Sequence, residues 1–188
     1  MNRAYSVLNI KAVDDGSDER KFTGIASTPS ADRSGDIVEP KGALYKLPLP
    51  LLWQHKHADP IGWITSASVT DAGIEVEGRI ATIDEDGPLK DRLTNAWQML
   101  KSQLVRGLSI GFNPIESSRI EGTYSYRFLK WEWLELSAVT IPANEEATIT
   151  SIKSADRQLQ AALGRKAVSF VQIPPGVSGH RQGVVYFK

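Results

Sequence analysis

The stretch Leu129-Lys130-Trp131-Glu132-Trp133-Leu134-Glu135-Leu136-Ser137-Ala138-Val139 has the composition of a β-strand. Successive side chains of a strand point to opposite faces, so Glu132 is expected beside Lys130 on a face that meets solvent. Glu135 is expected on the opposite face, with the apolar side chains of Leu129, Trp131, Trp133 and Val139. An acidic side chain on an apolar face is costly unless it is paired or hydrogen-bonded. A carboxylate that is protonated or paired with a histidine would resolve this cost, and an edge position or a structural hydrogen bond would also explain Glu135.

The rest of the chain is also mostly strand-like. Strands are predicted over residues 5–13, 21–27, 47–57, 61–69, 74–83, 108–114 and 124–141. Residues 61–69 and 74–83 are predicted to form a hairpin, because Asp71-Ala72-Gly73 between them has a turn composition. This order of elements predicts a mainly β fold with helices (α+β), built as a closed or nearly closed barrel.

One segment is predicted to be an amphipathic helix, between Gly87 and Gly107. Its apolar residues recur every three or four positions, at Leu89, Leu93, Trp97, Leu100 and Leu104. Gly107 is expected to end the helix. A second helix is predicted over residues 154–163. Residues 1–154 are expected to form one domain, followed by a loosely attached C-terminal tail, 155–188.

Composition excludes several classes of protein. The 188 residues contain 22 Lys+Arg and 22 Asp+Glu, and this balance argues against a nucleic-acid-binding protein. There is no cysteine, which excludes disulfides, thiolate metal sites and a cysteine nucleophile. No apolar run approaches the roughly 20 residues of a membrane span, and the first residues lack a secretory signal. A soluble protein that acts in a cytoplasm, with no membrane partner, is expected.

Ser109 is the candidate nucleophile. Gly107-Leu108-Ser109-Ile110-Gly111 matches G-x-S-x-G, yet a helix precedes it and a strand follows, the reverse of the α/β-hydrolase context. In a strand, Ser109 shares its face with Gly107 and Gly111, so its hydroxyl would be accessible to a polypeptide backbone. From these residues alone, a serine in a glycine-weakened strand is the simpler explanation.

A serine nucleophile needs a base, and the chain has three histidines: His55, His57 and His180. His55 is expected to share a strand face with Leu51 and Trp53, although a surface histidine at a strand end explains it equally well. His55, His57 and Asp59 also fit the metal-ligand pattern H-x-H-x-D, but such a site needs further nitrogen ligands, which the chain hardly supplies. A Glu135 carboxylate paired with His55 would fix the imidazole tautomer, as the acid of a catalytic triad does.

Four segments together resemble the prohead serine proteases of tailed phages, distant relatives of the herpesvirus assemblins. The segments are Ile25-Ala26-Ser27-Thr28 with Asp32-Arg33-Ser34-Gly35-Asp36-Ile37-Val38; Leu52-Trp53-Gln54-His55 with Pro60-Ile61-Gly62; Gly107-Leu108-Ser109-Ile110-Gly111-Phe112; and Leu134-Glu135-Leu136-Ser137-Ala138-Val139-Thr140-Ile141-Pro142-Ala143-Asn144. Each segment is short, but their joint order and spacing are specific.

The resemblance implies a herpesvirus-protease-like β-barrel surrounded by helices. It implies that Ser109 is the nucleophile, His55 the base and Glu135 the third catalytic residue, with His57 as the alternative base. No metal or cofactor is implied. The herpesvirus enzymes place arginines after the third residue to hold the oxyanion loop, whereas residues 136–147 here contain none. Backbone amides near Pro142, Ala143 and Asn144 are the remaining candidates for the oxyanion hole.

The resemblance also implies a function. The substrates would be the major capsid protein and the scaffold protein, and the enzyme would act inside the phage prohead in the host cytoplasm. Cleavage of its own tail after about residue 155 and a homodimer are further expectations. The alternative function is a catalytically silent head-assembly module that binds its partners with the same barrel.

Overall fold

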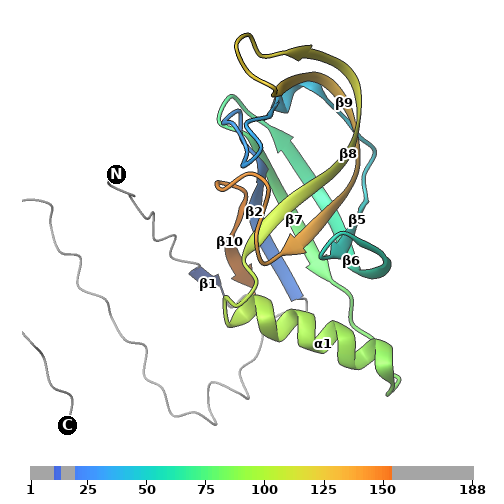
Figure 1. Cartoon of the computed structure of the whole chain (residues 1–188). Helices are drawn as coiled ribbons and strands as arrows, with labels where there is room; N and C mark the ends of the chain where they lie inside the picture. Colours follow the sequence, from blue (N-terminus) through green and yellow to red (C-terminus); the bar gives the residue numbers. More distant parts are fainter. Residues whose placement is uncertain (1–10, 14–19, 154–188) are drawn as a thin grey trace, which may run out of the picture. The chain divides into compact units, whose positions relative to one another are not determined.

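Residues 11–13 and 20–153 are described in the computed structural model of the chain (Figure 1). The predicted second helix and the tail from residue 155 onward lie outside the described residues. The predicted domain boundary at residue 154 therefore stays a prediction. Within the described residues, no helix is long and apolar enough to cross a membrane.

Seven of the described strands close into a barrel. They are β2 (Arg20–Ser27), β5 (Leu49–Trp53), β6 (Lys56–Val69), β7 (Ile74–Ile80), β8 (Gly107–Arg119), β9 (Tyr126–Val139) and β10 (Thr148–Lys153). Their order is β10-β2-β7-β6-β5-β9-β8, and β8 returns to β10 through the pair Gly107 and Thr148. The N–H of Leu108 donates to the carbonyl of Ala147 beside this pair, at 3.1 Å. The prediction of a mainly β barrel with helices is confirmed.

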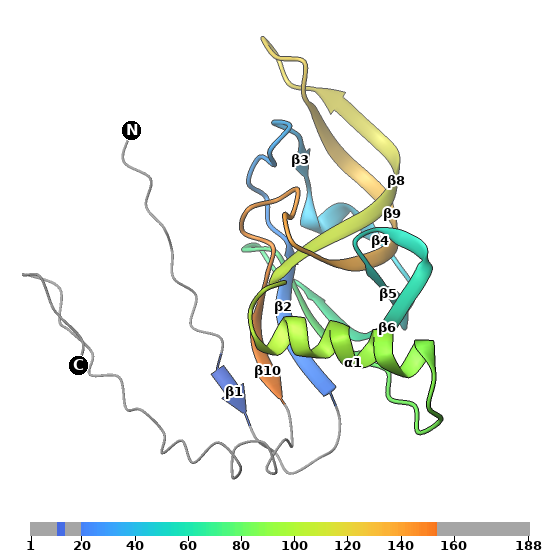
Figure 2. The same cartoon turned by 60° about the horizontal axis from the view of Figure 1, so that its bottom comes forward.

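Short elements and one helix complete the described fold. They are β1 (Lys11–Val13), β3 (Ile37–Val38), the 3₁₀ helix η1 (Pro40–Gly42), β4 (Ala43–Leu44) and α1 (Pro88–Lys101). The strands β3 and β4 both pair in parallel with β9. The helix α1 runs across one end of the barrel, as Figure 2 shows, and its buried side chains join the barrel core.

The predicted hairpin is confirmed, and a second hairpin was missed. β6 and β7 pair antiparallel around the turn 70–73. By contrast, residues 47–57 form two strands rather than one, because the chain reverses at Gln54 and His55 between β5 and β6. The predicted strands 108–114 and 124–141 correspond to β8 and β9, which continue as a long hairpin beyond the other strands of the barrel (Figure 1).

The observed helix is shorter than the helix that the apolar pattern predicted. α1 ends at Lys101 rather than at Gly107, and Gln103 then adopts a left-handed backbone with φ of 61°. Only the central residues of the predicted stripe, Leu93, Trp97 and Leu100, are buried. Leu89, in the first turn of α1, is 47% exposed. Leu104 is 70% exposed because it lies beyond the end of the helix.

A register shift between β8 and β9 overturns the predicted alternation around Glu135. Gly111 pairs with Glu135, but the next residue, Phe112, pairs with Trp133, so Leu134 is an extra residue in β9. Such a β-bulge moves the residues on its two sides to opposite faces of the strand pair. Glu135 therefore does not share a face with Trp131 and Trp133, as the sequence suggested.

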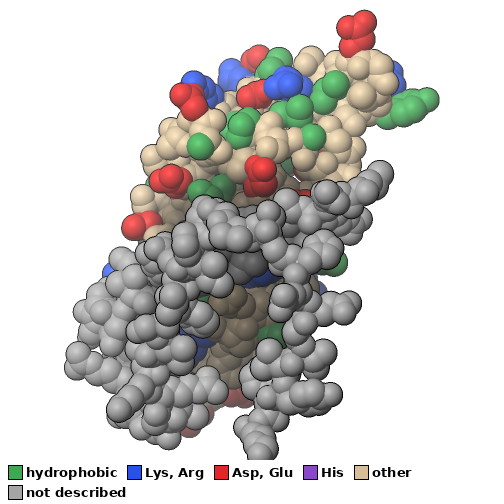
Figure 3. All heavy atoms as spheres, turned by 90° about the vertical axis from the view of Figure 1, so that its left-hand side faces the viewer, with side chains coloured by type: hydrophobic (Ala, Val, Ile, Leu, Met, Phe, Trp, Pro, Cys, Tyr) green, Lys and Arg blue, Asp and Glu red, His purple; other side chains and the backbone are tan. Residues whose placement is uncertain are grey.

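The two faces differ sharply in composition. Trp131, Trp133, Leu136 and Ala138 all belong to the barrel core, whereas Glu135 lies on the other face with the partners of Gly107 and Ser109. Lys130 and Glu132 are exposed, as predicted. On the face shown in Figure 3, acidic, basic and apolar side chains are interspersed over the described residues in view.

Two residues of the predicted helix stripe, Leu100 and Leu104, give a direct test of the fold. Leu100→Ala should lower the free energy of unfolding by about 2–5 kcal/mol, because it opens a cavity in the core. Leu104→Ala should change it by less than about 0.5 kcal/mol, since this side chain is mostly in solvent. Urea denaturation of both variants measures the difference, and equal losses would contradict the observed end of α1.

Candidate active site

His55 lies in a tight two-residue turn between β5 and β6, not on a strand face with Leu51 and Trp53 as expected. Trp53 pairs with Lys56, and the two residues between them have φ angles of 53° for Gln54 and 58° for His55. Two-residue hairpin turns favour this left-handed backbone, but normally with Asn or Gly. Residues with a Cβ lose roughly 1–2 kcal/mol each in this region. Other contacts must therefore hold the turn.

Those contacts all come from the end of β9. The backbone N–H of Gln54 donates to the carbonyl of Ala138 at 3.1 Å. Its side-chain amide donates to the Thr140 hydroxyl at 3.0 Å and accepts from the Thr140 N–H at 3.3 Å. The backbone N–H of His55 donates to the hydroxyl of Ser137 at 3.1 Å. The turn is thus fixed to the strand that also carries Glu135.

Glu135 has the histidine partner that its burial requires. Its Oε1 lies 2.8 Å from His55 Nδ1, and its Oε2 accepts a hydrogen bond from the Ser137 hydroxyl at 2.7 Å. The side chain of Glu135 is only 7% exposed, whereas that of His55 is 43% exposed. Both carboxylate oxygens are hydrogen-bonded, so the cost of burying the acid is offset. Two of the sequence alternatives for Glu135 are thus observed together: the histidine pair and a structural hydrogen bond.

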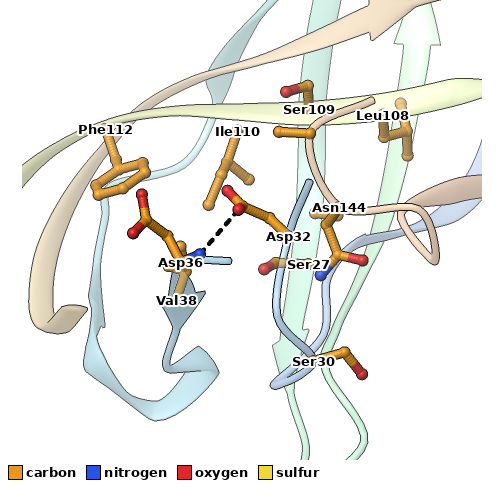
Figure 4. A pocket seen from close by; sticks show the side chains of 12 residues that line it. Ser27, Ser30, Asp32, Asp36, Val38, Leu108, Ser109, Ile110, Phe112 and Asn144 are labelled. Carbon is orange, nitrogen blue, oxygen red and sulfur yellow. Dashed lines mark hydrogen bonds between the residues drawn. The ribbon is translucent and has the colours of Figure 1, made fainter. Parts of the chain in front are cut away.

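Ser109 lies beside this network on the same face. It pairs with Ser137 across β8 and β9, and the next residue on that face, Gly111, pairs with Glu135. Figure 4 shows Ser109 on the opposite side of β8 from Ile110 and Phe112. Ser109 is 6% exposed.

The glycines of G-x-S-x-G have a different role from the one expected. A Cβ on Gly111 would overlap the carboxylate of Glu135, and one on Gly107 would lie 2.7 Å from Cδ of Pro142. These glycines make room for neighbouring protein groups. The sequence suggested instead that they leave the Ser109 hydroxyl accessible to a polypeptide. Gly111 in particular lets the Glu135 side chain lie flat over β8.

The structure brings together two of the three predicted catalytic residues by a hydrogen bond. His55 and Glu135 are bonded, and both contact Ser137, which pairs with Ser109. Among the residues that the structure describes, no hydrogen bond is found for the side-chain hydroxyl of Ser109, whose backbone pairs with Ser137 in the sheet. His57 is exposed on β6, and His180 lies outside the described residues. In the described ranges, no group of three or more His, Asp or Glu side chains is placed to hold a metal ion.

The loop after β9 also lies next to Ser109. Arg33 fixes it with three contacts: its backbone N–H donates to the carbonyl of Ala143, its Nε donates to the carbonyl of Pro142, and its guanidinium pairs with Glu145, each at 3.0 Å. Sequence reasoning singled out the segments around Arg33 and Pro142 but gave no sign that they touch.

A second set of bonds ties the same loop to residues 28–30. Glu146 accepts hydrogen bonds from the hydroxyls of Thr28, at 2.6 Å, and Ser30, at 2.8 Å. These bonds stabilise the carboxylate and hold the pKa of Glu146 below its usual value. The stabilisation is therefore fully present above the pKa that Glu146 has in the unfolded chain. It is lost as the pH falls through the lowered pKa of Glu146 in the folded chain.

A small cavity of about 50 Å³ lies between this loop and β8 (Figure 4). Its lining includes Ser109, Ala143, Asn144 and two acidic residues, Asp32 and Asp36. Asp32 accepts hydrogen bonds from the backbone of Ser34 and Asp36, at 2.8 and 3.0 Å, so this carboxylate shapes its own loop. The nucleophile candidate thus has the His55 network on one side and a small cavity on the other.

Comparison with known proteins identifies the family. Residues 33–161 match the family described as Caudovirus prohead serine protease, and this match covers more than half of the chain. The chain therefore belongs to the prohead serine protease family of tailed phages. The matched region contains His55, Ser109 and Glu135.

Two curated relatives agree with this assignment. The chain is 61% identical to a capsid polyprotein of Pseudomonas phage PAJU2 over 174 residues, which cover 93% of this chain and 26% of the relative. It is 28% identical to the prohead protease of Escherichia phage T5, covering 85% of this chain and 80% of that protein. The chain thus spans about a quarter of the capsid polyprotein and most of the T5 protein.

One solved structure matches part of the chain. It is the KSHV protease in complex with a hexapeptide phosphonate inhibitor, at 14% identity and a TM-score of 0.46, covering 70% of this chain and 64% of that one. A likeness of this degree carries no argument about function.

The contact between Gly111 and Glu135 can be measured by a double-mutant cycle. Gly111→Ala should lower the free energy of unfolding by about 1–3 kcal/mol, because the new methyl group overlaps the carboxylate. The same substitution in a Glu135→Ala background should cost clearly less, since the overlapping group is gone. Equal costs in both backgrounds would show that Glu135 does not lie over Gly111.

Proposed function

We propose that this chain is a serine endopeptidase of phage head maturation, with Ser109 as nucleophile, His55 as general base and Glu135 as the acid that orients the histidine. The observation that carries the proposal is the hydrogen bond between His55 Nδ1 and the buried carboxylate of Glu135, on the same face of β8 and β9 as Ser109. A nucleophile beside a base that is oriented by an acid is the arrangement of a catalytic triad.

The geometry at Glu135 supports one tautomer of His55. An ionised carboxylate only accepts hydrogen bonds, so His55 would carry its proton on Nδ1 and donate it to Oε1. Nε2 then has a free lone pair. It takes the hydroxyl proton as Ser109 Oγ attacks the peptide carbonyl, and returns it to the leaving amine. Water cleaves the resulting acyl-enzyme by the same proton transfers, and neither a metal nor a cofactor is required.

The loop after β9 supports a position for the oxyanion hole. Backbone N–H donors stabilise the negative oxygen of the tetrahedral intermediate by about 3–4 kcal/mol each. Ala143 and Asn144 line the cavity beside Ser109, whereas Pro142 has no N–H. The backbone N–H groups of Ala143 and Asn144 are therefore the proposed donors, held in place through Arg33, Thr28 and Glu146.

The relatives support the substrate class. One relative is named a capsid polyprotein and another a prohead protease. The proposed substrates are the major capsid protein and the scaffold protein, cut inside the prohead in the host cytoplasm. Cleavage of the chain's own tail and action as a homodimer belong to the same proposal.

A second candidate function is a catalytically silent head-assembly module with the same barrel. One observation favours it: in the described part of the chain, no hydrogen bond joins Ser109 to His55. Catalytic hydrogen bonds are often long before substrate binds, so the observation does not exclude a protease. Direct assay separates the two functions.

The test is co-expression with the major capsid protein of the same phage, read on a gel with mass assignment of the fragments. The wild-type chain should cleave the capsid protein, and Ser109→Ala should reduce the rate by at least about 10³-fold. Ser118→Ala, an exposed serine on the same strand, is the matched control and should cleave normally. Cleavage by Ser109→Ala contradicts the assignment of the nucleophile, and no cleavage by any folded variant favours the silent module.

A further inference from the structure

Ser137 occupies the centre of the proposed site, although sequence reasoning gave it no role. Its side chain is fully buried in β9, two residues after Glu135 and directly opposite Ser109 in β8. A buried hydroxyl needs hydrogen-bond partners. Both partners of Ser137 belong to the proposed catalytic machinery.

The hydroxyl uses its donor and an acceptor position at the same time. It donates its proton to Glu135 Oε2 at 2.7 Å and accepts the backbone N–H of His55 at 3.1 Å. Its single proton is then committed to Glu135, so Ser137 has none left to donate to Ser109. Among the described residues, Ser137 is the one group that bonds both the carboxylate of Glu135 and the backbone of His55.

These two bonds stabilise the two least favourable features of the network, which are the backbone of His55 and the buried carboxylate of Glu135. His55 has a left-handed backbone at a φ of 58°, which is unfavourable without an external contact. Glu135 is buried, and without Ser137 its Oε2 would have no donor. The bonds of Gln54 hold the preceding residue of the turn, so they do not replace the contact to His55.

We infer that Ser137 is a positioning residue of the proposed protease, which fixes the backbone of the base and the carboxylate of the acid in one register with the nucleophile. It touches neither substrate nor a reacting atom. Its effect is on the direction in which His55 Nε2 points. The inference rests on the proposed function of Ser109, His55 and Glu135.

The rate of covalent labelling by a fluorophosphonate measures this positioning without a known peptide substrate. Ser109 Oγ forms a bond to phosphorus, the P–F bond breaks, fluoride leaves, and the hydroxyl proton passes to His55. In Ser137→Ala, the maximal labelling rate should fall on the order of 10-fold or more, because small misplacements of catalytic groups cost that much. The reagent concentration at half-maximal rate should stay within about twofold, since the reagent's binding surface is unchanged.

A control variant separates positioning from loss of stability. Leu100→Ala destabilises the core at a residue of α1 that takes no part in the hydrogen-bond network of the site, and at a temperature where it is folded it should label at the wild-type rate. Should Ser137→Ala fail to fold, Ser137→Cys keeps the side-chain volume with a weak donor and acceptor, and the same loss of rate is expected. A Ser137 variant that folds and labels within twofold of wild type overturns the inference.

Proton–nitrogen NMR tests the placement of His55 without any turnover. The wild type should show a downfield resonance for the Nδ1 proton bonded to Glu135, which Ser137→Ala should lose or shift, although His55 and Glu135 are still present. A resonance that is absent in wild type or unchanged in Ser137→Ala overturns the inference. Labelling that depends on Ser109 but not on Ser137 would leave the proposed function intact, whereas a wild type that is never labelled contradicts that function itself.

Discussion

The extra residue Leu134 in β9 is the constraint on which the candidate site depends. Without it, strand alternation would place Glu135 on the core face with Trp131 and Trp133. With it, the core keeps its tryptophans and Glu135 moves to the face of Ser109. β-Bulges commonly redirect a side chain beside a functional site in this way. One inserted residue thus allows the same strand to serve the core and the site.

The other unfavourable features of the site are balanced by contacts with the same strand. A buried carboxylate and two left-handed residues would each destabilise the fold on their own. Here Glu135 receives hydrogen bonds at both oxygens, and Gln54 and His55 are bonded to residues 137–140, at and just beyond the end of β9. Strain retained at a turn that carries a histidine is typical of sites where geometry matters for function. The loop that follows β9, fixed by Arg33 and Glu146, extends the same rigid frame around Ser109.

Local sequence patterns were sufficient for the barrel class, the β6–β7 hairpin and the central turns of α1, because these depend on periodicity and turn composition. The residue types also pointed to His55, Ser109 and Glu135. The bulge was missed because neither Gly nor Pro marks Leu134, and the turn at His55 was missed because Gln-His is not a usual turn pair. The docking of Arg33 onto Pro142 joins residues more than 100 positions apart, which no local pattern reveals. Nothing in the sequence indicated a role for Ser137, apart from its position two residues after Glu135.

The proposed mechanism requires that His55, held by Glu135, activates Ser109. Mapping a fluorophosphonate adduct by peptide mass spectrometry in wild type, His55→Ala and His57→Ala tests it most directly. The account predicts that the wild type and His57→Ala carry the adduct on Ser109 and that His55→Ala carries almost none. An adduct on another residue, or one on Ser109 that depends on His57 rather than His55, would contradict it.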